Sequence, residues 1–201
     1  MDPVTALVQS LGLSFASGVS VYATAAFVGL AAHLGWVGPL PGALDFLASP
    51  WVFGPAGAIA LVEALALLVP GIATAWEAVH TAIRPLAAAA IAVLATWGEP
   101  RVAVVAGILG GALGLATHAT KLGMRATIDT SPEPVSNAAA TAGELGVVAA
   151  LAWLVWNHPW LALALALLLL VTLVLAVRAL WRAARRAVGA LFAPTPPAPG
   201  A

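Results

Sequence analysis

Two glutamates have the type and position best suited to chemistry. Glu63 and Glu144 each lie inside a long apolar stretch, 13 residues beyond Pro50 and 12 residues beyond Pro132 respectively. At about 1.5 Å per helical residue, each carboxyl group would lie roughly 18 Å into a bilayer core about 30 Å thick, and the two would enter from opposite sides. A carboxylate there costs on the order of 3 kcal/mol, so it must be protonated, paired or hydrated. The pair is predicted to bind a proton or a cation. The alternative is two neutral carboxylic acids hydrogen-bonded between helices.

Charged residues and histidines repeat one spacing, i, i+3 and i+7, on two predicted helices. The two sets are Glu77, His80 and Arg84, and His118, Lys121 and Arg125. Each set lines one face of its helix. If the faces meet, they would form a cationic vestibule for an anionic solute or lipid headgroup, or supply counter-ions to the two glutamates. The alternative is a set of cations that snorkel from helix ends to the cytoplasmic interface.

The sequence gives little support for an enzyme. Glu77-Ala78-Val79-His80 has the Glu-x-x-His form of di-iron bundles, but such sites need a second copy and two further carboxylates, and only one copy occurs. The chain has no cysteine, hence no thiol nucleophile and no disulfide. No spacing points to a serine–histidine–acid triad. We therefore predict no enzyme and no cofactor, and a membrane-embedded lipid enzyme ranks last among the functions considered.

The elements that position these residues are membrane helices. Hydrophobic residues make up 62% of the 201 positions and charged residues 8%, whereas soluble domains have about a quarter charged residues. A span needs about 20 apolar residues, which allows roughly six helices and no separate extramembrane domain. The lipid bilayer is the expected partner, and the formal net charge of zero gives no support for nucleic acid.

Apolar stretches bounded by Pro, Gly and Trp predict six spans. They lie near 11–37, 51–69, 74–97, 101–127, 133–156 and 160–178. Pro85 would bend the third span, for which a re-entrant or broken helix is the alternative. The proline-rich tail at 189–201 is predicted to be disordered.

The distribution of basic residues predicts the orientation. Four arginines, Arg178, Arg182, Arg185 and Arg186, follow the last span and place that end in the cytoplasm. Six spans then place the N-terminus there too. Tryptophans prefer interfaces, and they agree with this assignment. Trp36, Trp51, Trp97, Trp156 and Trp160 fall at outer boundaries, and Trp76 and Trp181 at inner ones.

A weak internal repeat divides the chain into two units. The Ser-Pro pairs that precede the two glutamates correspond, and residues 16–20 can be laid against 116–120. This predicts two three-helix membrane units, 1–100 and 101–188, the second inverted relative to the first. Inverted repeats are a recurrent transporter plan, with the binding site near the midplane. In addition, two overlapping Gly-x-x-x-Gly pairs at 107–114 predict close helix packing.

Several longer motifs resemble a known family. They are the stretch 12–18 with Tyr22-Ala23-Thr24, Leu47-Ala48-Ser49-Pro50-Trp51, the stretch 76–85, Ala119-Thr120-Lys121, and Thr130-Ser131-Pro132-Glu133-Pro134. Together they resemble the bacterial membrane family called domain of unknown function 4126, over roughly residues 10 to 185. The resemblance implies a membrane location and no established activity.

The sequence therefore predicts an all-α, polytopic transmembrane helix bundle in the bacterial inner membrane, with both termini cytoplasmic. The leading function is transport or permeation of a small solute or ion. Glu63 and Glu144 would exchange protons or bind a cation, and Lys121, Arg125, Arg84 and His118 would hold the opposing charge. The alternative is a non-transporting scaffold or assembly protein. A homo-oligomer is left open.

Overall fold

Helices account for almost all of the described chain. The structure is a computed structural model that describes residues 2–69, 71–128 and 134–191, and no strand occurs among them. It contains seven α-helices and one 3-10 helix: α1 (Pro3–Val19), α2 (Val21–His33), η1 (Leu44–Ala48), α3 (Pro50–Ala66), α4 (Ile72–Ala95), α5 (Pro100–Ile128), α6 (Pro134–Asn157) and α7 (Pro159–Leu191). The prediction of an all-α fold is confirmed.

Proline marks the start of most helices. It is the first residue of α1, α3, α5, α6 and α7. Proline suits this position because it lacks the N–H that a first helical residue leaves unpaired, and because its φ is already helical. Before α1, the Asp2 carboxylate accepts a hydrogen bond from the Thr5 N–H at 3.0 Å. That backbone hydrogen bond holds the pKa of Asp2 below its ordinary value.

The first predicted span, 11–37, is two helices and not one. Ser20 adopts an extended conformation (φ −155°, ψ 113°) that ends α1 and begins α2. Its hydroxyl accepts a hydrogen bond from the Ala23 N–H at 3.2 Å, as a helix N-cap does. Neither proline nor glycine occupies the break, so the periodicity of the sequence did not reveal it.

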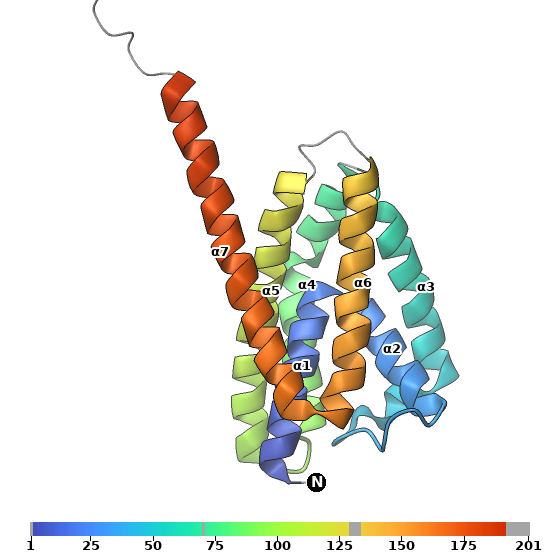
Figure 1. Cartoon of the computed structure of the whole chain (residues 1–201). Coiled ribbons are helices and arrows are strands. Elements are labelled where there is room, and N and C mark those ends of the chain that lie inside the picture. The colour runs from blue at the N-terminus through green and yellow to red at the C-terminus, as the bar shows by residue number, and fades with distance from the viewer. Residues whose placement is uncertain (1, 70, 129–133, 192–201) are drawn as a thin grey trace, which may run out of the picture.

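Helices α1 and α2 form a hairpin whose two outer ends lie at the same end of the bundle. Pro3, at the start of α1, borders a pocket with residues of the α4–α5 connection. The chain after α2 returns to that connection, where the Ala43 N–H donates to the Leu94 carbonyl at 2.8 Å. At the tip of the hairpin, Gly18 packs against Gly114, the middle residue of α5. The hairpin therefore enters from one end and turns back inside the bundle (Figure 1).

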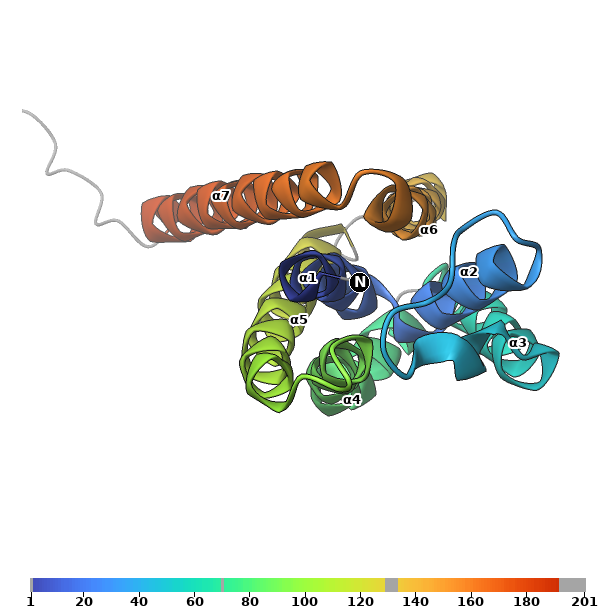
Figure 2. The same ribbon diagram turned by 90° about the horizontal axis from the view of Figure 1, so that it is seen from below.

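Helix α1 is the centre of the bundle. Seen along the bundle, it lies among α4, α5, α6 and α7 (Figure 2), and most of its residues are buried. Gly114 allows α5 to pack closely against α4 next to α1, because a Cβ added to Gly114 would lie 2.4 Å from the Ala88 Cβ on α4. This close approach confirms the packing role predicted for the glycine pairs of α5.

The outer surface of the bundle is apolar. Large hydrophobic side chains face outward, such as Leu61 on α3, Ile108 on α5 and Leu168 on α7, exposed by 62%, 68% and 60%. Among the described residues, four helices are long and apolar enough to cross a membrane: Ile72–Ala95, Pro100–Ile128, Val135–Asn157 and Pro159–Ala183. Helices α1, α2 and α3 are apolar but shorter. These features fit a membrane protein, but the predicted count of six spans is not reproduced.

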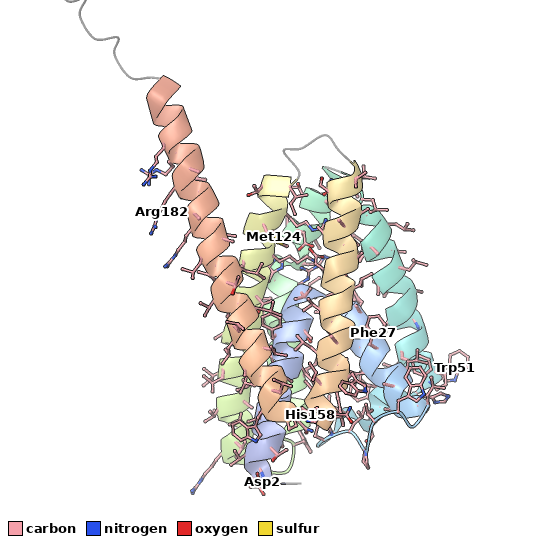
Figure 3. All side chains as sticks on the ribbon, in the orientation of Figure 1. Asp2, Phe27, Trp51, Met124, His158 and Arg182 are labelled. Carbon is pink, nitrogen blue, oxygen red and sulfur yellow. The ribbon has the colours of Figure 1, made fainter. Side chains whose placement is uncertain are left out.

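The two ends of the described chain lie at opposite ends of the bundle (Figure 1). Figure 3 shows Asp2 at one end and Arg182 towards the other. This arrangement does not fit the prediction of two cytoplasmic termini. The reason is the hairpin, because residues 11–37 include parts of two helices that run in opposite directions, where one span was predicted. The basic residues permit the change, because no Lys or Arg precedes Arg84.

The structure does not confirm the inverted repeat. The predicted units 1–100 and 101–188 meet at the start of α5. In the first unit Ser20 separates two helices, whereas α5, α6 and α7 are each continuous. The Ser131-Pro132 pair lies outside the described residues, as do residues 192–201 of the predicted tail. The prediction also places residues 189–191 in that tail, but they are the last residues of α7.

Candidate functional site

All eight predicted site residues lie inside the bundle, on four helices. Glu63 is on α3; Glu77, His80 and Arg84 are on α4; His118, Lys121 and Arg125 are on α5; and Glu144 is on α6. The predicted faces of α4 and α5 do meet. Their cations are buried and paired with carboxylates, so the structure shows neither an open cationic vestibule nor snorkelling side chains. Of the proposed roles, the supply of counter-ions to the glutamates matches the geometry.

Lys121 is the central residue of this network. Its ammonium lies 2.9 Å from the Glu77 carboxylate, 3.1 Å from Glu144 and 3.7 Å from Glu63. It also donates a hydrogen bond of 2.8 Å to the carbonyl of Val19, the last residue of α1. Lys121 thus joins the two glutamates that the sequence singled out, and it joins both to the end of the interrupted helix.

Arg84 makes a second junction between carboxylates. Its guanidinium donates to both oxygens of Glu77, at 2.6 and 3.1 Å, and to Glu63 at 2.5 Å. His118 lies against the same guanidinium, with its Nδ1 3.0 Å from Arg84 Nη1 and its Nε2 3.0 Å from the Thr81 hydroxyl. The planar fork of arginine suits such two-oxygen contacts. Arg84 therefore fixes the positions of two of the three carboxylates.

Arg125 holds the third carboxylate. Its Nε donates to Glu144 at 2.8 Å, and its two terminal nitrogens donate to the Thr141 hydroxyl at 2.9 Å and the Leu67 carbonyl at 3.3 Å. Leu67 directly follows α3. One guanidinium therefore joins α3, α5 and α6.

The helix break contributes directly to the site. The Ser20 hydroxyl donates to the Glu63 carboxylate at 2.6 Å, in addition to capping α2. Ser20 and the carbonyl of Val19 thus contact the charged network from the tip of the hairpin. The sequence pattern does not single out Ser20 as a site residue, and the Val19 carbonyl leaves no signal in a sequence.

The network contains three carboxylates and three basic side chains, those of Arg84, Lys121 and Arg125, and all of them lie in the interior. The side chains of Glu63, Glu77, Arg84, Lys121 and Arg125 are exposed by 4% or less, while that of Glu144 is exposed by 10%. The formal charges cancel when all six are ionised. Glu144 is the carboxylate of the network that is most accessible from outside.

His80 is less closely connected. Its Nδ1 lies 2.7 Å from the Trp76 carbonyl and its Nε2 lies 3.2 Å from the Tyr22 hydroxyl. Its ring stacks on Trp76. These contacts join α4 to α2 rather than to the carboxylates. His80 is therefore a neighbour of the charged network and not a member.

A polar stripe on α6 extends from Glu144. Asn137, Thr141 and Glu144 lie at i, i+4 and i+7, so they share one helical face. The Asn137 side chain is buried, and within the described residues neither its amide nitrogen nor its amide oxygen has a hydrogen-bond partner. A buried amide without a partner indicates a place where water can bind.

A small cavity lies between the two predicted glutamates. It has a volume of about 10 Å³ and is lined by Ser20, Glu63, Thr141 and Glu144 together with apolar residues of α3 and α6. Space of this order holds about one water molecule, and four polar groups surround it. Among the described residues, including those of this network, no group of three or more His, Asp or Glu side chains is placed to hold a metal ion.

The prediction from the sequence found the charged members of the site and missed its hydroxyl groups. Thr81 lies one turn beyond Glu77, and Thr141 three residues before Glu144. Both spacings place the hydroxyl on the face of the nearby carboxylate, so helical periodicity was the signal that could have found them.

Comparison with known proteins gives one family and no individual relative. No curated protein and no solved structure matches the chain. One family model, described as "Domain of unknown function (DUF4126)", matches residues 7–179. This range holds the hairpin, all three carboxylates and their partners, and nearly the whole of the described bundle. The chain therefore belongs to the DUF4126 family, as its motifs predicted.

Proposed function

We propose that this protein is a multi-pass inner-membrane transporter that moves a proton or small cation through the network around Lys121. The observation that carries the proposal is the ligand set of the Lys121 ammonium. Carboxylate oxygens from three helices and the carbonyl at the end of an interrupted helix surround one positive charge.

The cost of this arrangement supports a function other than packing. Charges within a bilayer are expensive and mark ion or proton pathways. Well-packed hydrophobic residues in place of a buried ion pair are often as stable or more so. Interrupted helices supply backbone carbonyls to cations in several transporters. The Val19 carbonyl has this position relative to Lys121.

Charge balance suggests how the network exchanges a cation. With Lys121 ionised, the three carboxylates and three cations sum to zero. If Lys121 passed a proton to water in the pathway, the cluster would carry one surplus negative charge, and an incoming proton or monovalent cation would restore neutrality. Lys121 is thus a tethered cation in a site made of oxygen ligands, and transport alternates it with a mobile one.

Glu144 is the proposed point of entry. It is the most exposed of the three carboxylates, and it borders the small cavity shared with Glu63 and Ser20. The stripe through Thr141 to Asn137 leads from Glu144 towards the start of α6, at the end of the bundle that holds Arg182 (Figure 3). By the positive-inside rule that end is cytoplasmic.

A second candidate is a scaffold, favoured by the pairing of each of the three carboxylates with an arginine. Arg84 and Arg125 each bridge separate helices. In that case the network stabilises the bundle and nothing moves through it.

Flux measurements in liposomes separate the two. Purified protein is reconstituted with a pH-sensitive dye inside, and proton or cation entry is driven by an imposed potential. If the protein is a transporter, Glu144→Gln combined with Glu63→Gln should abolish flux while the protein remains folded. Glu99→Gln is the matched control, since Glu99 is an exposed acid in the α4–α5 connection. Flux at the wild-type rate in the double variant, or no proton or cation flux in the wild type, would overturn the proposal.

A further inference from the structure

A large apolar cavity lies beside the charged network, between α7 and the rest of the bundle. Its volume is about 550 Å³. Cavities of roughly 300–1,000 Å³ are the size of small-molecule binding sites. Residues of α1, α5, α6 and α7 line it, and Figure 3 labels one of them, Met124 on α5.

The shape of this cavity suits an extended apolar chain. Along α5 its lining runs from Thr117 to Ile128, a distance of about 16 Å at the helical rise. The wall formed by α6 includes the small residues Ala139, Ala140 and Gly143, and a Cβ added to Gly143 would meet no atom within 4 Å. Gly143 therefore faces open space, into which a larger side chain at this position could project.

Helix α7 places the cavity at the level of the lipid. Leu169 and Leu173 line it from one side of α7, while Leu168 and Val171 on other sides of the helix are exposed by 60% and 55%. A helix with apolar residues on both sides is expected between lipid and an apolar ligand. Access from the bilayer then requires no passage through water.

The charged residues on the wall specify the polar group of the ligand. Among the lining residues that the structure describes, Lys121 and Glu144 are the charged ones. The Lys121 ammonium donates a hydrogen bond to the Val19 carbonyl and forms ion pairs with Glu77 at 2.9 Å and Glu144 at 3.1 Å. In Glu144, Oε1 accepts a hydrogen bond from Arg125 and Oε2 lies 3.1 Å from the Lys121 ammonium, while a carboxylate has about four acceptor sites. Glu144 can therefore accept a further hydrogen bond, whereas the Lys121 ammonium is already held by oxygen partners.

We infer that this cavity binds a neutral amphiphile that carries a hydroxyl group, such as a long-chain alcohol or a hydroxyl-bearing lipid. The hydroxyl donates to Glu144 and the apolar chain lies between α5, α6 and α7. A neutral headgroup fits because the six charges of the network already cancel, and a further buried charge would have no partner. The inference shares Glu144 with the proposed function but concerns a different ligand.

Photolabelling tests the inference directly. The protein in nanodiscs is exposed to a diazirine derivative of 1-dodecanol, and labelled peptides are identified by mass spectrometry. Saturable labelling of the lining segments of α5, α6 and α7 is expected. Unlabelled dodecanol should compete on the order of fivefold better than dodecane, since one hydrogen bond is lost in the alkane.

Two glycines of α6 provide matched variants. Gly143→Phe fills the cavity and should reduce labelling at least tenfold. Gly146→Phe should leave it unchanged, because Gly146 also has open space around it but lies outside the lining. If Gly143→Phe does not fold, Ala140→Leu takes its place, because it adds a smaller side chain to the same wall. It should also reduce labelling.

Labelling that does not saturate, equal competition by dodecane, or full labelling of the folded filling variants would each overturn the inference. These outcomes are distinct from a failure of the proposed function. Cation flux in alcohol-free liposomes would persist if only the amphiphile site were wrong. Specific labelling without any flux would instead support the amphiphile site and contradict the proposed transport function.

Discussion

Replacing Lys121 with methionine removes the one side chain that contacts all three carboxylates of the network. Methionine has a similar length and no charge, so the change leaves the carboxylates facing two arginines in a buried space. At an effective dielectric constant of about 20, each contact near 3 Å has a gross attraction of about 5 kcal/mol. The cost of burying the ammonium offsets much of this.

The net effect is taken from measured losses of one partner in a buried pair, which are about 3–5 kcal/mol. Lys121 has two carboxylates within 3.1 Å, Glu77 and Glu144, so Lys121→Met should lie at or above the upper value. Combining it with Glu144→Gln restores the balance of charge. The loss in free energy of unfolding in the double variant should therefore be smaller than the sum of the two single losses, by on the order of 2 kcal/mol.

Reversible unfolding in mixed micelles, followed by tryptophan fluorescence, measures this cycle. Arg101→Met combined with Glu99→Gln changes one charge of each sign at exposed positions and should have little effect. If the two changes at Lys121 and Glu144 were simply additive, or if Lys121→Met had no more effect than Arg101→Met, the account of a charge-balanced network would be refuted.

Three further predictions follow from the hairpin and its packing. Ser20→Ala removes the cap of α2 and a bond to Glu63, and should cost about 1–2 kcal/mol in the unfolding assay; unchanged stability would contradict the role of the break. Gly114→Ala places a Cβ 2.4 Å from that of Ala88 and should destabilise by about 1–3 kcal/mol, whereas Gly146→Ala should be tolerated; the reverse order would show that α4 and α5 are packed differently. Because the chain has no cysteine, Asp2→Cys and Arg182→Cys can be labelled singly with an impermeant maleimide. The structure predicts labelling from opposite sides of the membrane, and labelling from the same side would restore the six-span topology.

Much of the site could be predicted from the sequence, because its information is local. The spacing shared by Glu77, His80 and Arg84 and by His118, Lys121 and Arg125 fixes which side chains lie on one helical face, whatever the tertiary arrangement. The apolar composition likewise determines that charges gather inside and hydrophobic side chains face outward. These properties depend on helical periodicity and on the apolar environment of the chain, and both can be inferred from a single sequence.

The tertiary structure alone decided the topology and the pairing. The break at Ser20 depends on what its hydroxyl meets, Glu63 on another helix, and no propensity in residues 11–37 records that contact. Because the chain folds back at Ser20, the start of α1 lies at the end of the bundle opposite to the end of α7 (Figure 1). The same break brings the Val19 carbonyl to Lys121. Hydrogen bonds between distant segments select one arrangement among several that the helical pattern allows equally.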